Sequence, residues 1–284
     1  MEIENEDQRT LSNSEKTGEM SRRIVCWIGD APNHWALASR FAGEFGIEGV
    51  VVDKKRSINA RRGWKQLLNR AIDKFRFGKI DKAWSRMQDY YKQRKDIPSS
   101  VPVLEVDNIN DPAVKEFTEK LGAELVIVSG TSLIKEPLVS LPLKKGIMNL
   151  HTGLSPYVKG GPNCTNWCIA NQQWHLIGNT IMWISAGIDS GNIISSEQTK
   201  IEEEDDLDTI HLKVMRHAHD LYLRAASCII EQQPPYPSVP QSELGKGALF
   251  LTKMWTAEKK KQLLKNLNGK RNSQLFIRTI PLSE

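Results

Sequence analysis

The fold of this 284-residue chain is set by the stretch Arg23-Ile24-Val25-Cys26-Trp27-Ile28-Gly29 and the two segments that follow it. This nearly unbroken apolar run is typical of a buried strand. Residues 34–45 are expected to form a helix, and residues 47–53 a second strand. A strand–helix–strand order predicts an α/β protein with a doubly wound, mostly parallel, Rossmann-like sheet.

The turn after the first strand, Gly29-Asp30-Ala31-Pro32-Asn33, bears on the class of ligand. It lacks the glycine-rich fingerprint of dinucleotide-binding proteins. The sequence also has no phosphate-binding loop that ends in a lysine followed by serine or threonine. The sequence therefore argues against a nicotinamide-dependent dehydrogenase and against a P-loop enzyme.

The remaining elements continue the alternation of strands and helices. A helix is expected to begin at Asp111, with Pro112 in its first turn and Gly122 after its end. A long helix is expected from Asp208, as its N-cap, to about Gln232. The other expected strands are 101–106, 125–128, the strand through Asn149 and His151, 175–185, 192–198 and 250–255, and the other expected helices are 136–140, 162–171 and 257–267.

The domain boundaries are predicted from composition and from the spacing of these elements. Residues 1–22 are polar and mixed in charge, and are expected to be a disordered leader. Residues 23–200 form the main domain, with a basic helical insert at 54–96. Residues 201–284 are interpreted as a helical C-terminal extension, because their segments look too short and interrupted for an independent domain.

The overall composition is that of a soluble protein, with 39% hydrophobic and 26% charged residues. No apolar run approaches the ~20 residues that cross a bilayer, so we expect a cytoplasmic protein without a membrane partner. Cys164 and Cys168 lie close in sequence but lack further ligands at zinc-site spacing. We expect them to be packed thiols on one helix face, and we expect no metal.

Basic residues are concentrated in one part of the chain. Residues 54–95 hold fifteen Lys or Arg against three acids, in a chain with a net charge of +5. Three interpretations stay open: a solvated helix face, attraction of an anionic ligand, and contact with RNA. The spacing of apolar residues predicts one packed face in this insert, made of Trp64, Leu67, Leu68, Ala71, Ile72 and Phe75.

Three polar residues are candidates for chemistry. Asn149 and His151 point to the same side of an extended strand, while Leu150 turns to the core. Asp189 lies between glycines at the end of another apolar segment. The loop that begins at Ser129 follows a buried strand, and ligands sit outside the carboxyl ends of strands in open parallel sheets. Taken singly, each residue could be a turn former or a packed polar group.

Taken together, these residues resemble a known family. Residues 125–194 resemble the catalytic half of the folate-dependent formyltransferases, and the layout is closest to that of the small-molecule and sugar N-formyltransferases. The resemblance rests on Asn149-Leu-His151, on Gly153-Leu154-Ser155-Pro156 with Lys159-Gly160 after it, and on Gly187-Ile188-Asp189-Ser190-Gly191. These three blocks occur in the family's order.

The resemblance implies a reaction and a co-substrate. A formyl group would pass from 10-formyltetrahydrofolate to an amine, without a metal. Asn149 would donate an amide N–H to the developing oxyanion. His151 would stabilise this charge or handle the proton, and Asp189 would orient the imidazole or relay the proton through water. The sequence leaves the proton route open.

The resemblance also implies two sets of binding residues. The folate pocket would be lined by Ser129, Gly130, Ser132, Leu133, Ile134, Ala186 and Ile188. The acceptor would lie beside Gly153, Leu154, Ser155 and Lys159. Lys159 stands where many relatives carry arginine, and Ser155 stands where the tRNA enzymes carry a leucine. Both departures concern the identity of the acceptor.

Three functions are consistent with these residues. We expect an N-formyltransferase acting on a small amine, a nucleotide-linked amino sugar, because the chain lacks the long C-terminal β-domain of the tRNA enzymes and residues 163–171 resemble those of small-molecule relatives. The first alternative is a methionyl-tRNA or glycinamide ribonucleotide formyltransferase. The second is a non-catalytic folate- or RNA-binding protein on the same scaffold. Nucleic acid is the less favoured partner, and a homodimer stays open.

Overall fold

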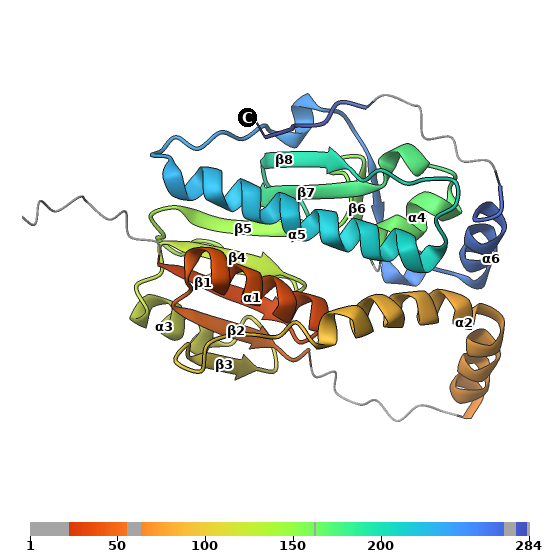
Figure 1. Cartoon of the computed structure of the whole chain (residues 1–284), viewed down its shortest axis with the longest axis horizontal. Helices are drawn as coiled ribbons and strands as arrows, with labels where there is room; N and C mark the ends of the chain where they lie inside the picture. The colour runs from red at the N-terminus through yellow and green to blue at the C-terminus, as the bar shows by residue number, and fades with distance from the viewer. Residues whose placement is uncertain (1–22, 56–63, 162, 270–276, 283–284) are drawn as a thin grey trace, which may run out of the picture.

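The structure, a computed structural model, describes residues 23–55, 64–161, 163–269 and 277–282. The expected leader at residues 1–22 lies outside these described residues. A seven-stranded sheet forms the centre, in the order β3-β2-β1-β4-β5-β7-β8 (Figure 1). Its strands are β1 (Ile24–Gly29), β2 (Gly49–Asp53), β3 (Val103–Val106), β4 (Leu125–Ser129), β5 (Gly146–His151), β7 (Gly178–Trp183) and β8 (Ile193–Gln198).

Strands β1 to β5 run parallel to one another, whereas β7 pairs antiparallel with β5 and β8. The predicted α/β, doubly wound and mostly parallel sheet is therefore confirmed. The order of the strands reverses between β1 and β4, and ligands of such sheets bind near this reversal.

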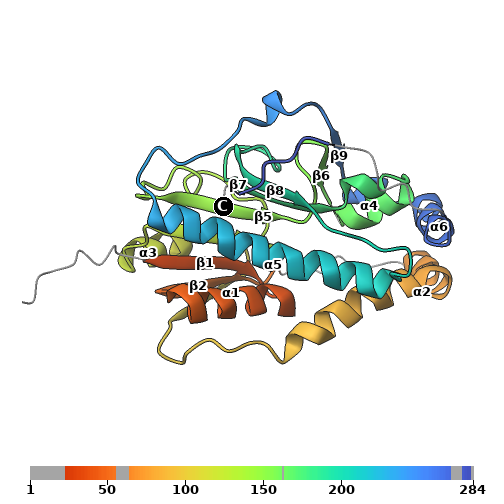
Figure 2. The same cartoon turned by 45° about the horizontal axis from the view of Figure 1, so that its top comes forward.

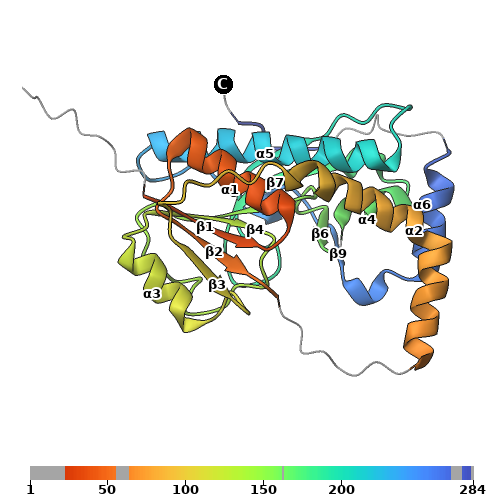
Figure 3. The same ribbon diagram turned by 60° about the horizontal axis from the view of Figure 1, so that its bottom comes forward.

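Helices cover both faces of the sheet (Figure 3). Helices α1 (Pro32–Phe45) and α5 (Leu207–Glu231) lie on one face, and α3 (Pro112–Lys120) lies on the other. The alternation of side chains along β1 explains this arrangement. Cys26 and Ile28 pack toward α1 and α5, whereas Val25 and Trp27 pack toward α3.

Side-chain caps fix the starts of several helices. Asp111 accepts a hydrogen bond from the Ala113 N–H at 2.9 Å, as expected for the cap of α3. The predicted cap of α5 at Asp208 is wrong. Asp206 has extended backbone angles and accepts the Thr209 N–H at 2.8 Å, because the buried Leu207 already belongs to the first helical turn. Asp208 lies in that first turn.

Two short segments differ from the predicted elements. Residues 136–140 form consecutive turns rather than a helix, because Pro137 cannot donate a backbone hydrogen bond and five residues are too few to stabilise a helix. The predicted strand at 250–255 is shorter and earlier. Strand β9 (Ala248–Phe250) is followed by a 3-10 turn, η3 (Thr252–Met254).

Strand β9 pairs in parallel with β6 (Val158–Gly160), about ninety residues earlier, in a second small sheet (Figure 2). Next to it pack α4 (Cys164–Ala170) and α6 (Ala257–Asn266). The ring of Trp167 on α4 stacks on Phe250, with centroids 4.5 Å apart. The short 3-10 turns η1 (Trp174–Leu176) and η2 (Gln241–Glu243) complete the assigned elements.

The basic insert forms helix α2 (Trp64–Lys92), which packs against α1, α5 and α6. Its buried residues recur every three or four positions: Phe77, Ile80, Ala83, Met87 and Tyr91. The predicted packed face is wrong at Phe75, whose side chain is 93% exposed. The other five members of that predicted face lie outside the described side chains. The buried residues keep the helical period, but contacts with α1, α5 and α6 decide which side of α2 is buried.

Helix α5 follows the expected domain boundary at residue 200 but supplies residues to the same core as β1 and β4. The boundary therefore marks no separate core in the described part of the chain, and the division into domains stays a prediction. No helix among the described residues is long and apolar enough to cross a membrane.

Tyr222 on α5 reaches the sheet where β4 and β5 pair. Its buried hydroxyl accepts the Val128 N–H at 3.0 Å and donates to the Met148 carbonyl at 2.7 Å. Val128 is the partner of Asn149 in this parallel pair. The hydroxyl thus bonds to the backbone of both strands next to Asn149.

Candidate active site

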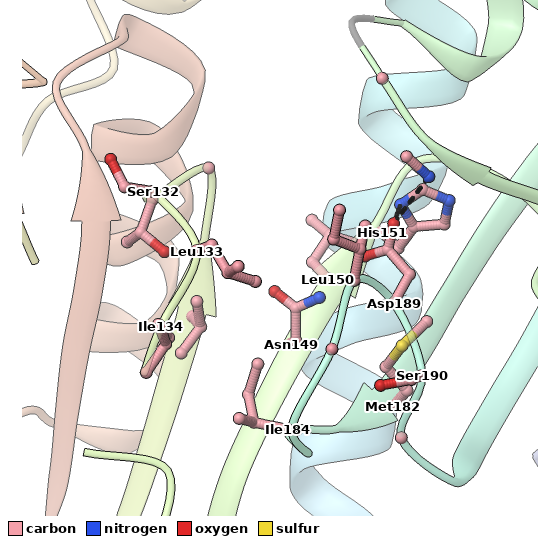
Figure 4. Close-up of a pocket in the computed structure, with 18 of the residues that line it drawn as sticks. Ser132, Leu133, Ile134, Asn149, Leu150, His151, Met182, Ile184, Asp189 and Ser190 are labelled. Atoms are coloured by element: carbon pink, nitrogen blue, oxygen red, sulfur yellow. Dashed lines mark hydrogen bonds and ion pairs between the residues drawn. The ribbon is translucent and has the colours of Figure 1, made fainter. Parts of the chain in front are cut away.

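A cavity of about 560 Å³ lies at the carboxyl ends of β4 and β5. Its size is in the range of small-molecule sites in proteins. The walls come mainly from the loop after β4, the end of β5, the loop between β7 and β8, and the residues around β9. Lys55, Gly160 and Gly161 complete them. Figure 4 shows Asn149 in the middle, between the Leu133 loop and the pair formed by His151 and Asp189.

The strand period brings Asn149 and His151 to the same cavity. They lie opposite Met182 and Thr180 on β7, two positions apart, so their side chains point the same way. Both line the cavity, and His151 is only 7% exposed. Leu150 is buried in the main core cluster, as expected, although it also touches the cavity.

Both ring nitrogens of His151 face acceptor groups. Its Nε2 lies 3.0 Å from the Val158 carbonyl, and its Nδ1 lies 3.4 Å from Asp189 Oδ2. The Cys164 sulfur lies 3.6 Å from Nε2. Burial by itself disfavours the charged ring, but the Cys164 sulfur, the Asp189 carboxylate and the Val158 carbonyl outweigh it and raise the pKa of His151. The geometry thus favours an imidazolium that donates from both nitrogens.

Asp189 is held by a tightly built turn. Its backbone has a φ of +45°, and its Oδ2 accepts the Gly160 N–H at 2.8 Å. Gln241, far along the chain, donates from Nε2 to the carbonyls of Asp189 and Gly191 at 2.7 and 2.8 Å. A side chain at Gly191 would collide with the backbone, since a Cβ there would lie 1.7 Å from the Trp183 oxygen. These contacts fix Asp189 against His151.

The expected folate-side residues fall into two groups. Gly130, Ser132, Leu133, Ile134 and Ile188 line the cavity, whereas Ser129 and Ala186 are not among its lining residues. The Ser129 hydroxyl instead lies 2.9 Å from Nδ1 of His34, behind the wall. The φ of Gly130 is +71°, and a Cβ there would lie 2.0 Å from the His34 ring, so this position requires glycine.

The four expected acceptor-side residues do not line the cavity: Gly153, Leu154, Ser155 and Lys159. Leu154 and Ser155 are buried, and the Ser155 N–H donates to the Thr180 hydroxyl at 3.0 Å. Gly153 packs so closely that a Cβ there would lie 2.6 Å from His151 Nε2. In the described structure this loop supports the histidine from behind. Its contact with the acceptor stays a prediction.

Several cavity residues were not found from the sequence. The backbone of Gly160 and the residues Phe250, Leu251 and Thr252 form one wall. This wall exists because β6 pairs with β9, and no local pattern reveals such a long-range pair. Lys55, at the end of β2, also lines the cavity. Cys164 was expected only as a packed thiol, and it is indeed buried, but it also contacts His151.

The sequence model of the formyl transferase family matches residues 81–226, just over half of the chain. The chain belongs to the formyl transferase family. The match includes Asn149, His151 and Asp189, but not Lys55 or the segment around β9.

Curated relatives of this family member include methionyl-tRNA formyltransferases. The protein from Syntrophus aciditrophicus is 34% identical over 137 residues, which are 48% of this chain and 43% of that protein. The one from Clostridium tetani is 25% identical over 177 residues, 60% of this chain and 56% of the relative. The chain thus matches only about half of the length of these relatives.

Solved structures share the fold at low sequence identity. A phosphoribosylglycinamide formyltransferase from Anaplasma phagocytophilum has a TM-score of 0.52 at 18% identity, over 81% of this chain and 98% of that one. An N-formyltransferase from Helicobacter canadensis, solved with folinic acid and dTDP-3-aminofucose, has a TM-score of 0.54 at 16% identity, over 86% and 80%. These likenesses establish the formyltransferase fold.

Proposed function

We propose that the protein transfers a formyl group from 10-formyltetrahydrofolate to the primary amine of a small acceptor. The observation that carries this proposal is the assembly of Asn149, His151 and Asp189 in one cavity. Glycine-containing backbone and the apolar side chains of Leu133, Ile134 and Ile188 flank the three polar residues. This mixture suits a flat, partly apolar pteridine next to a reacting formyl group.

The proposed chemistry begins with attack of the amine on the formyl carbon. A C–N bond forms, and the formyl oxygen becomes an oxyanion. The amide N–H of Asn149 and the protonated ring of His151 stabilise this charge, which builds up in the transition state as the tetrahedral intermediate forms. Protonation of His151 before the reaction is supported by its two acceptor contacts and its raised pKa.

The intermediate then collapses, and the bond between the formyl carbon and N10 of the folate breaks. One proton leaves the attacking nitrogen, and one proton reaches N10. His151 and Asp189 both line the cavity, so their ion pair lies where it can take part in both proton transfers. The Gly160 N–H keeps the Asp189 carboxylate in this position.

We propose a nucleotide-linked amino sugar as the acceptor. The support is the resemblance of residues 163–171 to small-molecule formyltransferases and the sugar-nucleotide complexes among proteins of the same fold. The wall made by Phe250, Leu251 and Thr252 lies outside the family match. It is therefore a part of the cavity in which this chain can differ from relatives with other acceptors.

The test is a transfer assay with 10-formyltetrahydrofolate labelled in its formyl group. Amino sugars linked to thymidine, uridine or guanosine diphosphate are offered beside glycinamide ribonucleotide and methionyl-tRNA. We expect label on a nucleotide-linked amine, and we expect the His151→Ala protein to transfer none. Full activity of His151→Ala would refute the catalytic proposal.

The second candidate acceptor is methionyl-tRNA, because the relative at 34% identity is a methionyl-tRNA formyltransferase. Label on charged tRNA, without label on any sugar nucleotide, would replace the first acceptor by this one. A competition assay with uncharged tRNA in the presence of the sugar nucleotides separates binding of RNA from turnover. RNA that binds through phosphates loses affinity steeply as salt rises.

A further inference from the structure

Two neighbouring lysines at the end of β2 have different surroundings. Lys54 is paired, with its Nζ 3.2 Å from Asp30 and 3.0 Å from Glu105. Lys55 is exposed and lines the cavity, and within the described part of the chain no carboxylate pairs with its ammonium group. Lys55 therefore places a positive charge at the cavity that its own neighbourhood does not neutralise.

Asp53 fixes the place of Lys55. Asp53 is fully buried, and its Oδ1 accepts the Lys55 N–H at 3.1 Å. Its Oδ2 accepts the Ser132 N–H at 2.6 Å, in the loop after β4. Lys55 has a φ of +47°, a backbone conformation that few residues other than glycine adopt freely. One buried carboxylate thus joins the lysine to the folate-side wall of the cavity.

The other charged groups near the folate-side wall do not neutralise Lys55, so its ammonium group can bind an anion. Among the described lining residues the other charged side chains are His151 and Asp189, which pair with each other. His34 packs behind Gly130, and burial, together with the charge of Lys55, lowers its pKa to about 4. His34 is therefore neutral near pH 7, and Lys55 supplies the positive charge on this side.

We propose that Lys55, positioned by Asp53, is an anion-binding residue of the cavity. Its ligand is a carboxylate of the folate glutamate or a phosphate of the acceptor. The inference rests on the proposed function, which names these two anions. Lys55 contacts the ligand, whereas Asp53 acts through Lys55 and through the loop that contains Ser132.

The first experiment measures binding of folinic acid and of dTDP to the whole protein by calorimetry. The Lys55→Met variant is expected to raise the Kd of one of these probes about five-fold at low salt, as for a partly exposed ion pair. The effect should shrink in about 0.5 M salt, where exposed pairs are screened. A change for folinic acid assigns the carboxylate, and a change for dTDP assigns the phosphate.

Matched variants separate the charge from its position. Lys54→Met removes an adjacent lysine that is already paired, and should leave both Kd values unchanged. Lys55→Arg keeps the charge and should keep most of the affinity. Asp53→Asn preserves the shape but cannot accept two N–H groups, so it should weaken the same probe as Lys55→Met. Combined with Lys55→Met, its effect should be less than additive.

The outcomes that contradict the inference are distinct from those that contradict the function. If the unaltered protein binds folinic acid and Lys55→Met weakens neither probe, Lys55 binds no anion. If the effects of Asp53→Asn and Lys55→Met simply add, Asp53 does not position Lys55. If the unaltered protein neither binds folinic acid nor transfers a formyl group, the proposed function fails as well.

Discussion

The ion pair between His151 and Asp189 leads to a prediction about the pH dependence of catalysis. The change is Asp189→Asn, which removes one negative charge and keeps the size of the side chain. Asparagine also tolerates the positive φ of this position, +45°, so the turn should survive. The Gly160 N–H can still bond to the amide oxygen. The variant therefore perturbs the charge beside His151 more than the fold.

The size of the effect follows from the 3.4 Å between His151 Nδ1 and Asp189 Oδ2. Coulomb's law gives about 5 kcal/mol at an effective dielectric constant of about 20, and about 1 kcal/mol at that of water. Because about 1.4 kcal/mol corresponds to one pKa unit, loss of the charge should lower the pKa of His151 by about one to three and a half units.

The sign of the pH effect follows from the direction of the shift. The folded protein raises the pKa of His151 above its usual value, so the imidazolium persists through neutral pH. Activity that needs the imidazolium should fall only as the pH rises through this raised pKa. In Asp189→Asn the fall should begin at lower pH. With the larger shift, from a pKa of about 10, only a few per cent of the His151 ring stays protonated at pH 8, so kcat at that pH should drop by up to about 30-fold.

The assay is the rate of formyl transfer at saturating substrates between pH 5 and 10. The control is Glu197→Gln, which removes a carboxylate from another histidine pair, 3.0 Å from His217 and away from the lining residues of the cavity. Its alkaline limb should coincide with that of the unaltered protein. An unchanged alkaline limb in Asp189→Asn would refute the role given to the ion pair.

Three further predictions concern catalysis and stability. Asn149→Ala should lower kcat by about 10² to 10³ with little change in the melting temperature, because it removes one donor to the oxyanion; a variant with full kcat would contradict this role. Lys145→Met should lower the free energy of unfolding, measured in urea, by about 3 kcal/mol. The reason is that the buried Lys145 ammonium donates to the carbonyls of Ile229, Ile230 and Gln232 at the end of α5. Lys144 is exposed, so Lys144→Met is the control. Hydrogen bonds from His217 and Arg224 lower the pKa of Glu197 to about 2. This carboxylate should therefore add about 1 to 2 kcal/mol to the free energy of unfolding above pH 4.5, and this contribution should be lost as the pH falls toward 2. If Glu197→Gln and the unaltered protein unfold at the same acid pH, the carboxylate makes no such contribution.

Much of the fold follows from local patterns in the sequence. The run from Ile24 to Gly29 is buried on both faces, and such strands are apolar throughout. The helix start at Asp111 is local too, since its side chain bonds the backbone N–H of Ala113, two residues away. The wrong cap at Asp208 came from a cluster of acids in which two neighbouring positions satisfy the same rule.

The candidate site, like the fold, has features that the local sequence predicts and features that it does not. The shared direction of Asn149 and His151 follows from the two-residue period of a strand, and it could be predicted. The approach of Cys164 to His151, and of Gln241 to the Asp189 turn, depends on how distant segments pack. The wall at Phe250 required a pairing across about ninety residues. Such contacts are fixed by the core as a whole, so no short window of sequence contains them.

The hydroxyl of Tyr222 gives the cavity a dependence on the opposite side of the sheet. It comes from α5 and bonds to Val128 on β4 and to Met148 on β5, one residue before Asn149. A side chain that is not among the lining residues therefore helps to hold the two strands that frame the cavity. Tyr222→Phe removes both bonds, and the position of Asn149 would shift with the strands. A screen for altered acceptor choice should thus include the hidden face of α5 as well as the visible rim.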